Sequence, residues 1–432
     1  MQRSVRGTAD LFGTRMAKRK WVGDVLCSAA ELCGYLPVET PVIEPLAVFQ
    51  RTLGPGSEVV AKEMFEIKPR AEGDDLLVLR PENTASVVRA VLNANLQHAL
   101  PLHLYYLGPQ FRYERPQRGR QRQFTQFGVE CFGKNNPETD LESIVTANLA
   151  LTRVLGGENK IKLKINTLGA GETDRQVFTE RFLEHLTQHQ SSLSEDTRRR
   201  ISEGRVLRVL DSKDLGDISV VESGPKLIDF LPPAESARLH STIRQLQQVH
   251  GMANVELDHN LVRGLDYYSQ VCFEFVSQDL GGLTVCAGGR YDGLAKTLGH
   301  ATPLPAIGWA CGVERLELLV KDFTPAKLDV LVVPLFTSGG ESNELIQTRA
   351  AQLVQSAREM GLSSRAYCGG VMEKNSLKKA LKEAETVRAT FACVVGQQEV
   401  ESDVVLVRDM ATATVTERPA SLASKWMSQL CK

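Results

Sequence analysis

The alternation of hydrophobic and polar residues over the first 325 residues predicts strands joined by short turns, with only occasional helices. Apolar residues at helical spacing predict helices over 16–36 and 82–96. Strand-like runs occur at 62–67, 76–79, 102–111, 123–132, 161–165, 271–276 and 283–287. Strands connected in this way favour an α+β domain built on a mostly antiparallel sheet.

Two further segments have a different character. Residues 170–255 are rich in Glu, Arg, Gln and Leu at helical spacing, which predicts a helical insertion into the first domain, 1–325. After a linker near residue 325, strands and helices alternate through 327–432. This pattern predicts a C-terminal α/β domain.

Composition excludes several classes of protein. The 432 residues are 42% hydrophobic and 24% charged, with a net charge of −1, and no apolar run reaches the roughly 18 residues of a membrane helix. The N-terminus lacks the hydrophobic core of a signal peptide. The nine cysteines include no C-x-x-C pair, which argues against structural zinc. We expect a cytoplasmic protein, with supply to an organelle left open, and any nucleic acid must be bound by local basic patches.

An arginine-rich loop is the first candidate for chemistry. The chain has no Gly-rich phosphate-binding motif, but five arginines and one glutamate fall within 112–122, between two strands. Arginine forks suit phosphates, and Phe124 offers a ring for stacking a base. A solvated basic hairpin is the alternative reading of this loop.

Polar residues next to this loop predict a pocket floor. Gln126 and Glu130 lie on the same side of a strand as Phe124 because side chains alternate along a strand. Such a face would suit a ligand with an ammonium group and a flat ring. Glu82 follows a strand and precedes a helix, where it could serve the pocket or merely the helix start.

Three later segments carry similar residue types. Segment 261–268 places Arg263 beside a tyrosine pair, and segment 288–294 repeats a cation, a tyrosine and an acid within a glycine-bracketed turn. Such a segment is often only a turn. In 308–316 a glycine-rich strand leads into a helix with Arg315 in its first turn, which suggests a bound anion, although a solvated surface arginine is the alternative.

Together these segments resemble the histidyl-tRNA synthetase family, of the bacterial-type branch, among class II aminoacyl-tRNA synthetases. The first class motif resembles 34–45, centred on Pro41, the second 112–130 and the third 308–315. Segments 261–268 and 287–294 resemble signatures peculiar to this family, and 5–8 and 207–213 also match. Trp309-Ala-Cys311 departs from the usual third motif, and we expect only altered packing there.

The resemblance implies a histidine–tRNA ligase that uses ATP with Mg²⁺, with no dedicated protein site for the metal. It implies a homodimer formed through the Pro41 motif, and anticodon binding by 327–432. Histidine would be bound by Glu82, Thr84, Gln126, Glu130, Tyr268 and Tyr291, and ATP by Arg112, Glu114, Phe124, Arg263 and Arg315. Arg263 and Arg112 would be catalytic, and Gln117 would approach the tRNA acceptor end.

Two other readings use the same fold. One is the histidine-sensing regulatory subunit of ATP phosphoribosyltransferase, which is not catalytic. Such subunits usually lack the anticodon domain and the ATP-site arginines, whereas Arg112, Arg263, Arg315 and residues 327–432 are present here. The other is the synthetase-like module of a stress-sensing kinase, and the chain contains no kinase domain. We therefore favour the synthetase.

Overall fold

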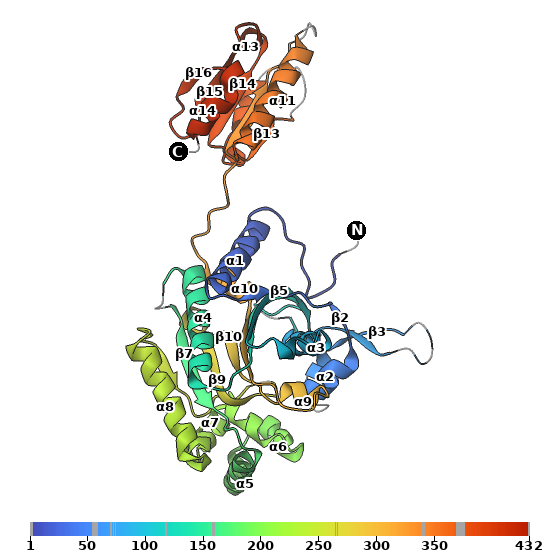
Figure 1. The fold of residues 1–432 in the computed structure, drawn as a ribbon, viewed down its shortest axis with the longest axis vertical. Coiled ribbons are helices and arrows are strands. Elements are labelled where there is room, and N and C mark those ends of the chain that lie inside the picture. Colours follow the sequence, from blue (N-terminus) through green and yellow to red (C-terminus); the bar gives the residue numbers. More distant parts are fainter. Residues whose placement is uncertain are drawn as a thin grey trace. The chain divides into compact units, whose positions relative to one another are not determined.

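The computed structural model describes residues 3–53, 59–69, 71, 73, 75–116, 119–157, 160–263, 265, 267–337, 342–368 and 376–430. The chain divides into two compact units, Met1–Phe323 and Thr324–Lys432 (Figure 1). Each unit has its own hydrophobic core and is described by itself.

An eight-stranded sheet forms the centre of the first unit. Its strands, in spatial order, are β1 (Leu36–Pro37), β5 (Leu102–Phe111), β6 (Gln123–Phe132), β11 (Ala306–Gly312), β10 (Leu283–Arg290), β9 (Ser269–Ser277), β7 (Lys162–Thr167) and β8 (Val255–Leu257). Only the outermost pairs, β1 with β5 and β7 with β8, are parallel. The predicted α+β class with a mostly antiparallel sheet is therefore confirmed. A second sheet contains β2 (Ile43–Pro45), β4 (Leu77–Leu79) and β3 (Phe65–Ile67).

The two faces of the large sheet are built from different residues. One face carries large apolar side chains, including Phe127, Trp309 and Phe273, which pack against helices. These helices are α1 (Gly13–Leu32), α4 (Pro137–Leu155), α8 (Pro233–Gln248) and α10 (Val313–Leu319). The opposite face of the central strands carries small residues, such as Gly128 on β6 and Gly308 on β11. Because side chains alternate along each strand, the sheet has one closely packed face and one open face.

Trp309 occupies the packed face. Its ring lies 5.6 Å from that of Phe127, and it crosses above Gly288 of the neighbouring strand. A Cβ at Gly288 would lie 2.5 Å from the Trp309 Cβ, so glycine is required beneath this tryptophan. The side chain of Trp309, the unusual residue of the third motif, therefore packs on the closely packed face of the sheet and not on the open face.

The helical insertion contributes to both faces. It contains α5 (Glu172–Gln188), α6 (Glu195–Ser202), the 3-10 helix Val206–Asp211 (η5), α7 (Leu215–Ser223) and α8. Leu239 and Leu246 of α8 belong to the packed face, whereas α5, η5 and α7 join a second core on the open side. Figure 1 shows α8 running beside α4, with α5, α6 and α7 grouped together.

A buried carboxylate ties the smaller insertion helices together. Asp217 of α7 accepts hydrogen bonds from the Ser194 amide and hydroxyl and from the Thr197 and Ser212 hydroxyls. Burial acts to raise the pKa of Asp217, but these four hydrogen bonds hold it below the ordinary value. The ends of α6, η5 and α7 are thereby fixed to one another.

Several elements of the first unit differ from the sequence expectations. The expected strand 62–67 begins only at Phe65, because Val59–Glu63 forms a π-helical turn. The expected helix 82–96 is α3 (Thr84–Asn93), preceded by Glu82 as a capping residue. Helix α4 was not predicted, although Asn136 caps it and Pro137 stands in its first turn. Two short helices, α2 (Leu46–Leu53) and α9 (Leu294–Thr297), complete this unit.

The second unit is an α/β domain, as predicted. Its sheet has the order β13 (Ser364–Ala366), β12 (Val330–Pro334), β14 (Phe391–Val395), β15 (Val404–Asp409) and β16 (Val415–Pro419). The first three strands are parallel, and β15 and β16 extend the sheet in antiparallel fashion. Its helices are α11 (Asn343–Glu359), α12 (Ser376–Thr386), α13 (Gln397–Glu401) and α14 (Ala423–Leu430). No described helix of either unit is long and apolar enough to cross a membrane.

Candidate active site

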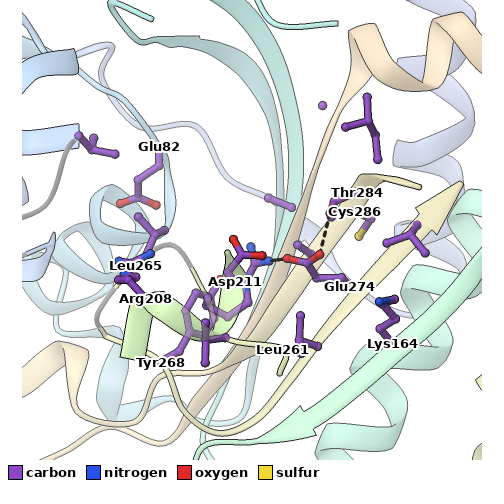
Figure 2. A pocket seen from close by; sticks show the side chains of 18 of the residues that line it. Glu82, Lys164, Arg208, Asp211, Leu261, Leu265, Tyr268, Glu274, Thr284 and Cys286 are labelled. Carbon is purple, nitrogen blue, oxygen red and sulfur yellow. Dashed lines mark hydrogen bonds and ion pairs between the residues drawn. The ribbon is translucent and has the colours of Figure 1, made fainter. Parts of the chain in front are cut away.

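A cavity of about 930 Å³ opens on the side of the large sheet that carries the small residues. Its walls come from the 112–126 strand pair, the 261–268 segment, strands β9 and β10, and the insertion helix η5. Figure 2 shows Glu82 on one side of this cavity and Arg208 and Asp211 of η5 reaching it from the insertion. Residues separated by more than 200 positions therefore meet in one site.

Two buried carboxylates lie close together at one end of the site. The Glu130 Oε1 atom accepts a 2.7 Å hydrogen bond from the Thr84 hydroxyl, and Oε2 accepts one from the Tyr291 hydroxyl. Burial raises the pKa of Glu130 to about 8, although both hydrogen bonds act to lower it. The nearby Glu82 charge raises it further. A cation bound here would relieve this repulsion.

Glu82 serves the helix start and the cavity at once. Its oxygens accept from the Thr84 amide at 2.7 Å and from the Ala85 amide at 3.0 Å, which satisfies the first amides of α3. The same side chain lines the cavity together with Thr84. The helix-start reading of Glu82 is confirmed, and its position on the cavity wall leaves the binding role a prediction. Burial raises the pKa of Glu82 above the ordinary value despite these hydrogen bonds.

Tyrosines surround the carboxylates. Tyr267 and Tyr268 line the cavity with ring centres 4.7 Å apart, and Tyr267 meets Tyr291 edge-to-face at 5.8 Å. Of the described residues, neither Tyr291 nor Glu130 is among those lining the cavity. Tyr291 instead contacts Glu130 directly. Tyr291 thus orients a carboxylate, whereas Tyr268 presents its ring to the open space.

Gln126 presents a polar atom to the same region. It lines the cavity, and its Oε1 atom is buried without a hydrogen-bond partner within the described part of the chain. An unpaired buried carbonyl oxygen is costly unless a ligand donates to it. The site therefore offers an acceptor to an ammonium or ring N–H group.

Arginines form the other end of the site. The Arg112 Nε donates to the Pro81 carbonyl at 2.9 Å, and its guanidinium carbon lies 5.5 Å from the centre of the Phe124 ring. Glu114 lies 3.3 Å from Arg120. Arg112, Glu114 and Phe124 all line the cavity. This places an aromatic face beside cationic forks, the arrangement expected for a nucleotide.

Two further arginines face the same space. Arg263 pairs with Glu274, and Arg315 donates to the Thr284 carbonyl oxygen. Burial acts to lower the pKa of both guanidinium groups. For Arg263 burial is the largest single effect, but the charges of Glu274 and of the neighbouring Tyr268, Cys272 and Tyr267 together outweigh it, so its pKa is raised and the guanidinium stays charged.

Residues 7–316 match the Histidyl-tRNA synthetase family, and residues 329–430 match the Anticodon binding domain. A histidine–tRNA ligase from Rhodospirillum rubrum is 40% identical over 409 residues, which cover 94% of each chain. The chain belongs to the histidyl-tRNA synthetase family. Its activity class is that of a histidine–tRNA ligase, a class II aminoacyl-tRNA synthetase.

Solved structures agree with this membership of the histidyl-tRNA synthetase family. The apo histidyl-tRNA synthetase of S. aureus covers 99% of this chain with 27% identity and a TM-score of 0.77, and all of that chain is covered. A Bacillus halodurans structure described as an ATP phosphoribosyltransferase regulatory subunit/histidyl-tRNA synthetase has 21% identity and a TM-score of 0.65. It covers 92% of this chain and 98% of its own. The latter likeness shows the fold alone.

The structure brings together most of the side chains that the resemblance to histidyl-tRNA synthetases selects. Gln117, predicted to approach the acceptor end, lies outside the described residues. Pro41 stands at the surface near the sheet edge, where Arg80 donates to the Thr40 carbonyl at 2.7 Å and the Pro109 carbonyl at 3.0 Å. Arg80 thus joins the first motif to β5.

Sequence reasoning missed several residues of this synthetase site. Glu274, the partner of Arg263, is an isolated acid in the otherwise apolar run Val271–Val276, a signal that could have identified it. Thr284 gave no such signal. Arg200, Arg205 and Arg208 of the insertion also line the cavity, and their position depends on packing between distant segments.

A buried ion network supports the end of the site that contains Glu130. Arg290, fully buried, donates through Nε and Nη2 to Asp140 at 2.8 and 2.5 Å. Arg238 of insertion helix α8 binds the other Asp140 oxygen at 2.5 Å. Because Arg290 directly precedes Tyr291, the network fixes the strand end that presents this tyrosine to Glu130.

Proposed function

We propose that this histidine–tRNA ligase activates L-histidine with Mg·ATP in the cavity and transfers the histidyl group to the 3′ end of histidine tRNA. The observation that carries the proposal is the division of one cavity into two ends. Buried acceptors lie at one end, where Glu82 lines the cavity and Glu130 lies behind it, bonded to the lining residue Thr84; arginines (Arg112, Arg263 and Arg315) line the other end. A zwitterionic amino acid and a polyphosphate need these opposite environments.

Histidine would bind with its α-ammonium toward Glu82, Thr84, Gln126 and the Glu130 carboxylate. The unpaired Gln126 oxygen and the buried carboxylates Glu82 and Glu130 provide the acceptors that an ammonium group would need. The imidazole would then lie against Tyr268. Tyr291 would lie near the imidazole and would also hold the Glu130 carboxylate in place. A pocket that pairs polar ring nitrogens rejects apolar isosteres strongly.

ATP would stack its adenine on Phe124 and place its phosphates among the arginines. The histidine carboxylate attacks the α-phosphorus in line, and pyrophosphate leaves as histidyl-adenylate forms. Arg263 and Arg112 would stabilise the negative charge of the pentavalent transition state, so no protein nucleophile is needed. The terminal 3′-hydroxyl of the tRNA then attacks the acyl carbon and releases AMP.

Magnesium would enter with the nucleotide as part of the substrate. Among the described residues, no group of three or more His, Cys, Asp or Glu side chains is placed to hold a metal ion. The cavity carboxylates Glu114 and Glu274 are already paired with arginines. We assign no step to a resident metal.

The tRNA would contact both units. Gln117 and its loop would approach the acceptor end, and the second unit would bind the anticodon, in agreement with its family match. A minihelix that contains only the acceptor stem and T arm tests the second contact. We expect it to be charged with a KM raised by about tenfold or more, since several phosphate contacts are lost. An equal KM would refute anticodon binding.

A homodimer would form through the first-motif region. Exposed Leu36 and Ile43 stand at the edges of the two sheets of the first unit, with 65% and 51% of their surface accessible. Exposed apolar side chains at a strand edge favour pairing with another chain. Analytical ultracentrifugation would detect a dimer that Leu36→Glu with Ile43→Glu dissociates. A monomeric wild-type protein would contradict the proposal.

Histidine-dependent ATP–pyrophosphate exchange, followed by charging of histidine tRNA, tests the reaction. Arg263→Ala should lower adenylate formation far more than it weakens histidine binding measured by calorimetry. Equal losses would refute its place at the α-phosphate. Absence of exchange in the wild type would favour a regulatory, histidine-sensing role.

A further inference from the structure

Thr284 of β10 contacts Arg315 directly and also contacts Glu274, the partner of Arg263. The Thr284 hydroxyl donates to the Glu274 Oε2 atom at 2.6 Å, and the Thr284 carbonyl oxygen accepts from the Arg315 Nη1. The register of β10 against β9 shifts between Thr284 and Cys286, so Thr284 stands at a β-bulge. Bulges reorient a side chain near functional sites. Figure 2 shows Thr284 and Glu274 joined across the cavity wall.

Glu274 completes a connection to Arg263. Its Oε1 atom accepts from the Arg263 Nη1, while Oε2 is held by Thr284. Both carboxylate oxygens are therefore engaged, and both side chains of the ion pair are mostly buried, with 16% and 18% accessible surface. The neighbouring cation, Lys164, is bound to Asp258 at 2.7 Å rather than to Glu274.

Arg263 needs such support because its own backbone gives little. It stands in a segment without regular secondary structure, between β8 and β9. Its guanidinium carbon lies 5.6 Å from the centre of the Tyr268 ring, which limits it on one side only. A long arginine side chain on a loop loses much rotamer freedom when fixed, so an external partner is required for a single orientation.

We propose that Glu274 and Thr284 are positioning residues that hold Arg263 and Arg315 at a fixed separation before ATP binds. Thr284 would set both distances, Arg315 through its carbonyl and Arg263 through its hydroxyl and Glu274. The two guanidinium groups could then receive the α-phosphate and the departing pyrophosphate without rearrangement. This inference rests on the proposed adenylation reaction.

The opposite role for Glu274 makes a different prediction. A carboxylate that only sequesters Arg263 in the empty enzyme would compete with the phosphate. Its removal would then strengthen ATP binding or speed the reaction. A positioning carboxylate has the reverse effect, because its loss leaves Arg263 free to adopt unproductive orientations.

Thr284→Val tests this positioning role by removing one hydroxyl group. This nearly isosteric change removes the donor to Glu274 and keeps the carbonyl that binds Arg315. Thr284→Ser, which restores the hydroxyl, is the matched control. We expect Thr284→Val to lower the single-turnover rate of adenylate formation about 10- to 100-fold, with histidine KM within about twofold of wild type. Thr284→Ser should retain nearly the wild-type rate.

Glu274→Gln is the second variant and keeps the shape of the side chain. It should show the same loss of rate at unchanged histidine KM, and Thr284→Val should add little to it, because both changes break one chain of contacts. A wild-type rate in Thr284→Val, a faster rate in Glu274→Gln, or additive losses would overturn the inference. An inactive wild-type enzyme would instead overturn the proposed reaction, so the two failures are distinct.

Discussion

The hydrogen bond from Tyr291 to Glu130 predicts how histidine use depends on pH. Burial raises the pKa of Glu130 to about 8, and the Tyr291 and Thr84 hydroxyls moderate this rise by donating to the carboxylate. Below that pH the carboxyl group of the empty pocket is mostly protonated. Since the substrate ammonium needs the ionised carboxylate, kcat/KM for histidine should rise with pH up to about 8 and fall again where the substrate α-ammonium loses its proton.

Tyr291→Phe removes one of the two hydroxyl donors. A hydrogen bond to a charged group contributes about 1.5–3 kcal/mol, and one pKa unit corresponds to about 1.4 kcal/mol. The pKa of Glu130 should therefore rise by roughly one to two further units. At pH 7 the variant should show a kcat/KM for histidine about 10- to 100-fold below that of wild type, and this deficit should shrink as the pH increases.

The assay is histidine-dependent ATP–pyrophosphate exchange between pH 7 and 9.5, since the substrate imidazole itself titrates near 6.5. Tyr105→Phe is the matched control, because Tyr105 donates to Glu31 at 2.6 Å on the opposite face of the sheet. Its pH profile should coincide with that of wild type. The reasoning is refuted if kcat/KM for histidine in Tyr291→Phe depends on the same pKa as in the wild type, whatever the absolute rate of the variant.

Two other substitutions test the support of the site. Arg238→Met leaves the buried Asp140 without its partner from the insertion. We expect this variant to lower the free energy of unfolding by about 1–2 kcal/mol, measured by urea denaturation. The control Arg244→Met, on the exposed side of the same helix, should change the free energy of unfolding by less than about 0.5 kcal/mol. Gly308→Ala would bring a Cβ against the Glu130 carboxylate and within 2.5 Å of a neighbouring carbonyl oxygen. We expect histidine binding measured by calorimetry to be lost while ATP still binds, and a variant with normal histidine affinity would contradict the assigned pocket floor.

The sequence predicts local features of the fold well and composite features poorly. The long strands were predicted to the residue, 102–111 and 123–132, because both runs are rich in apolar and aromatic residues and are bounded by turn residues. Helix α4 is not among the predicted elements, although the cap at Asn136 and the proline that follows it mark its start. Strand β16 was not predicted because it is exposed at every position, which leaves no alternation to detect. Strand β15 was not predicted although its burial alternates.

In the candidate site, too, the residue types could be predicted from local sequence but the contacts between distant segments could not. Arginines and acids of the 112–130 strand pair could be selected from residue type and the two-residue period alone. The partner of each could not. Tyr291 and Glu130 are 161 positions apart, and Thr84 and Glu130 are 46 apart, so their hydrogen bonds depend on how distant strands pair. Periodicity therefore identified which side chains face the site, and tertiary structure determined which of them bind one another.

The arrangement of α8 bears on how the insertion can change during evolution. The insertion leaves the end of β7 and returns to the start of the parallel strand β8, and α8 covers the sheet on the way, as in a crossover connection. Removing the whole excursion would strip apolar cover from the packed face and would also remove Arg238 from Asp140. The portion before α8 lines one wall of the cavity but is also bonded to its other side, because Arg175 of α5 donates to the Tyr268 carbonyl at 3.3 Å. A change in that portion would therefore alter the cavity wall and the 261–268 segment together.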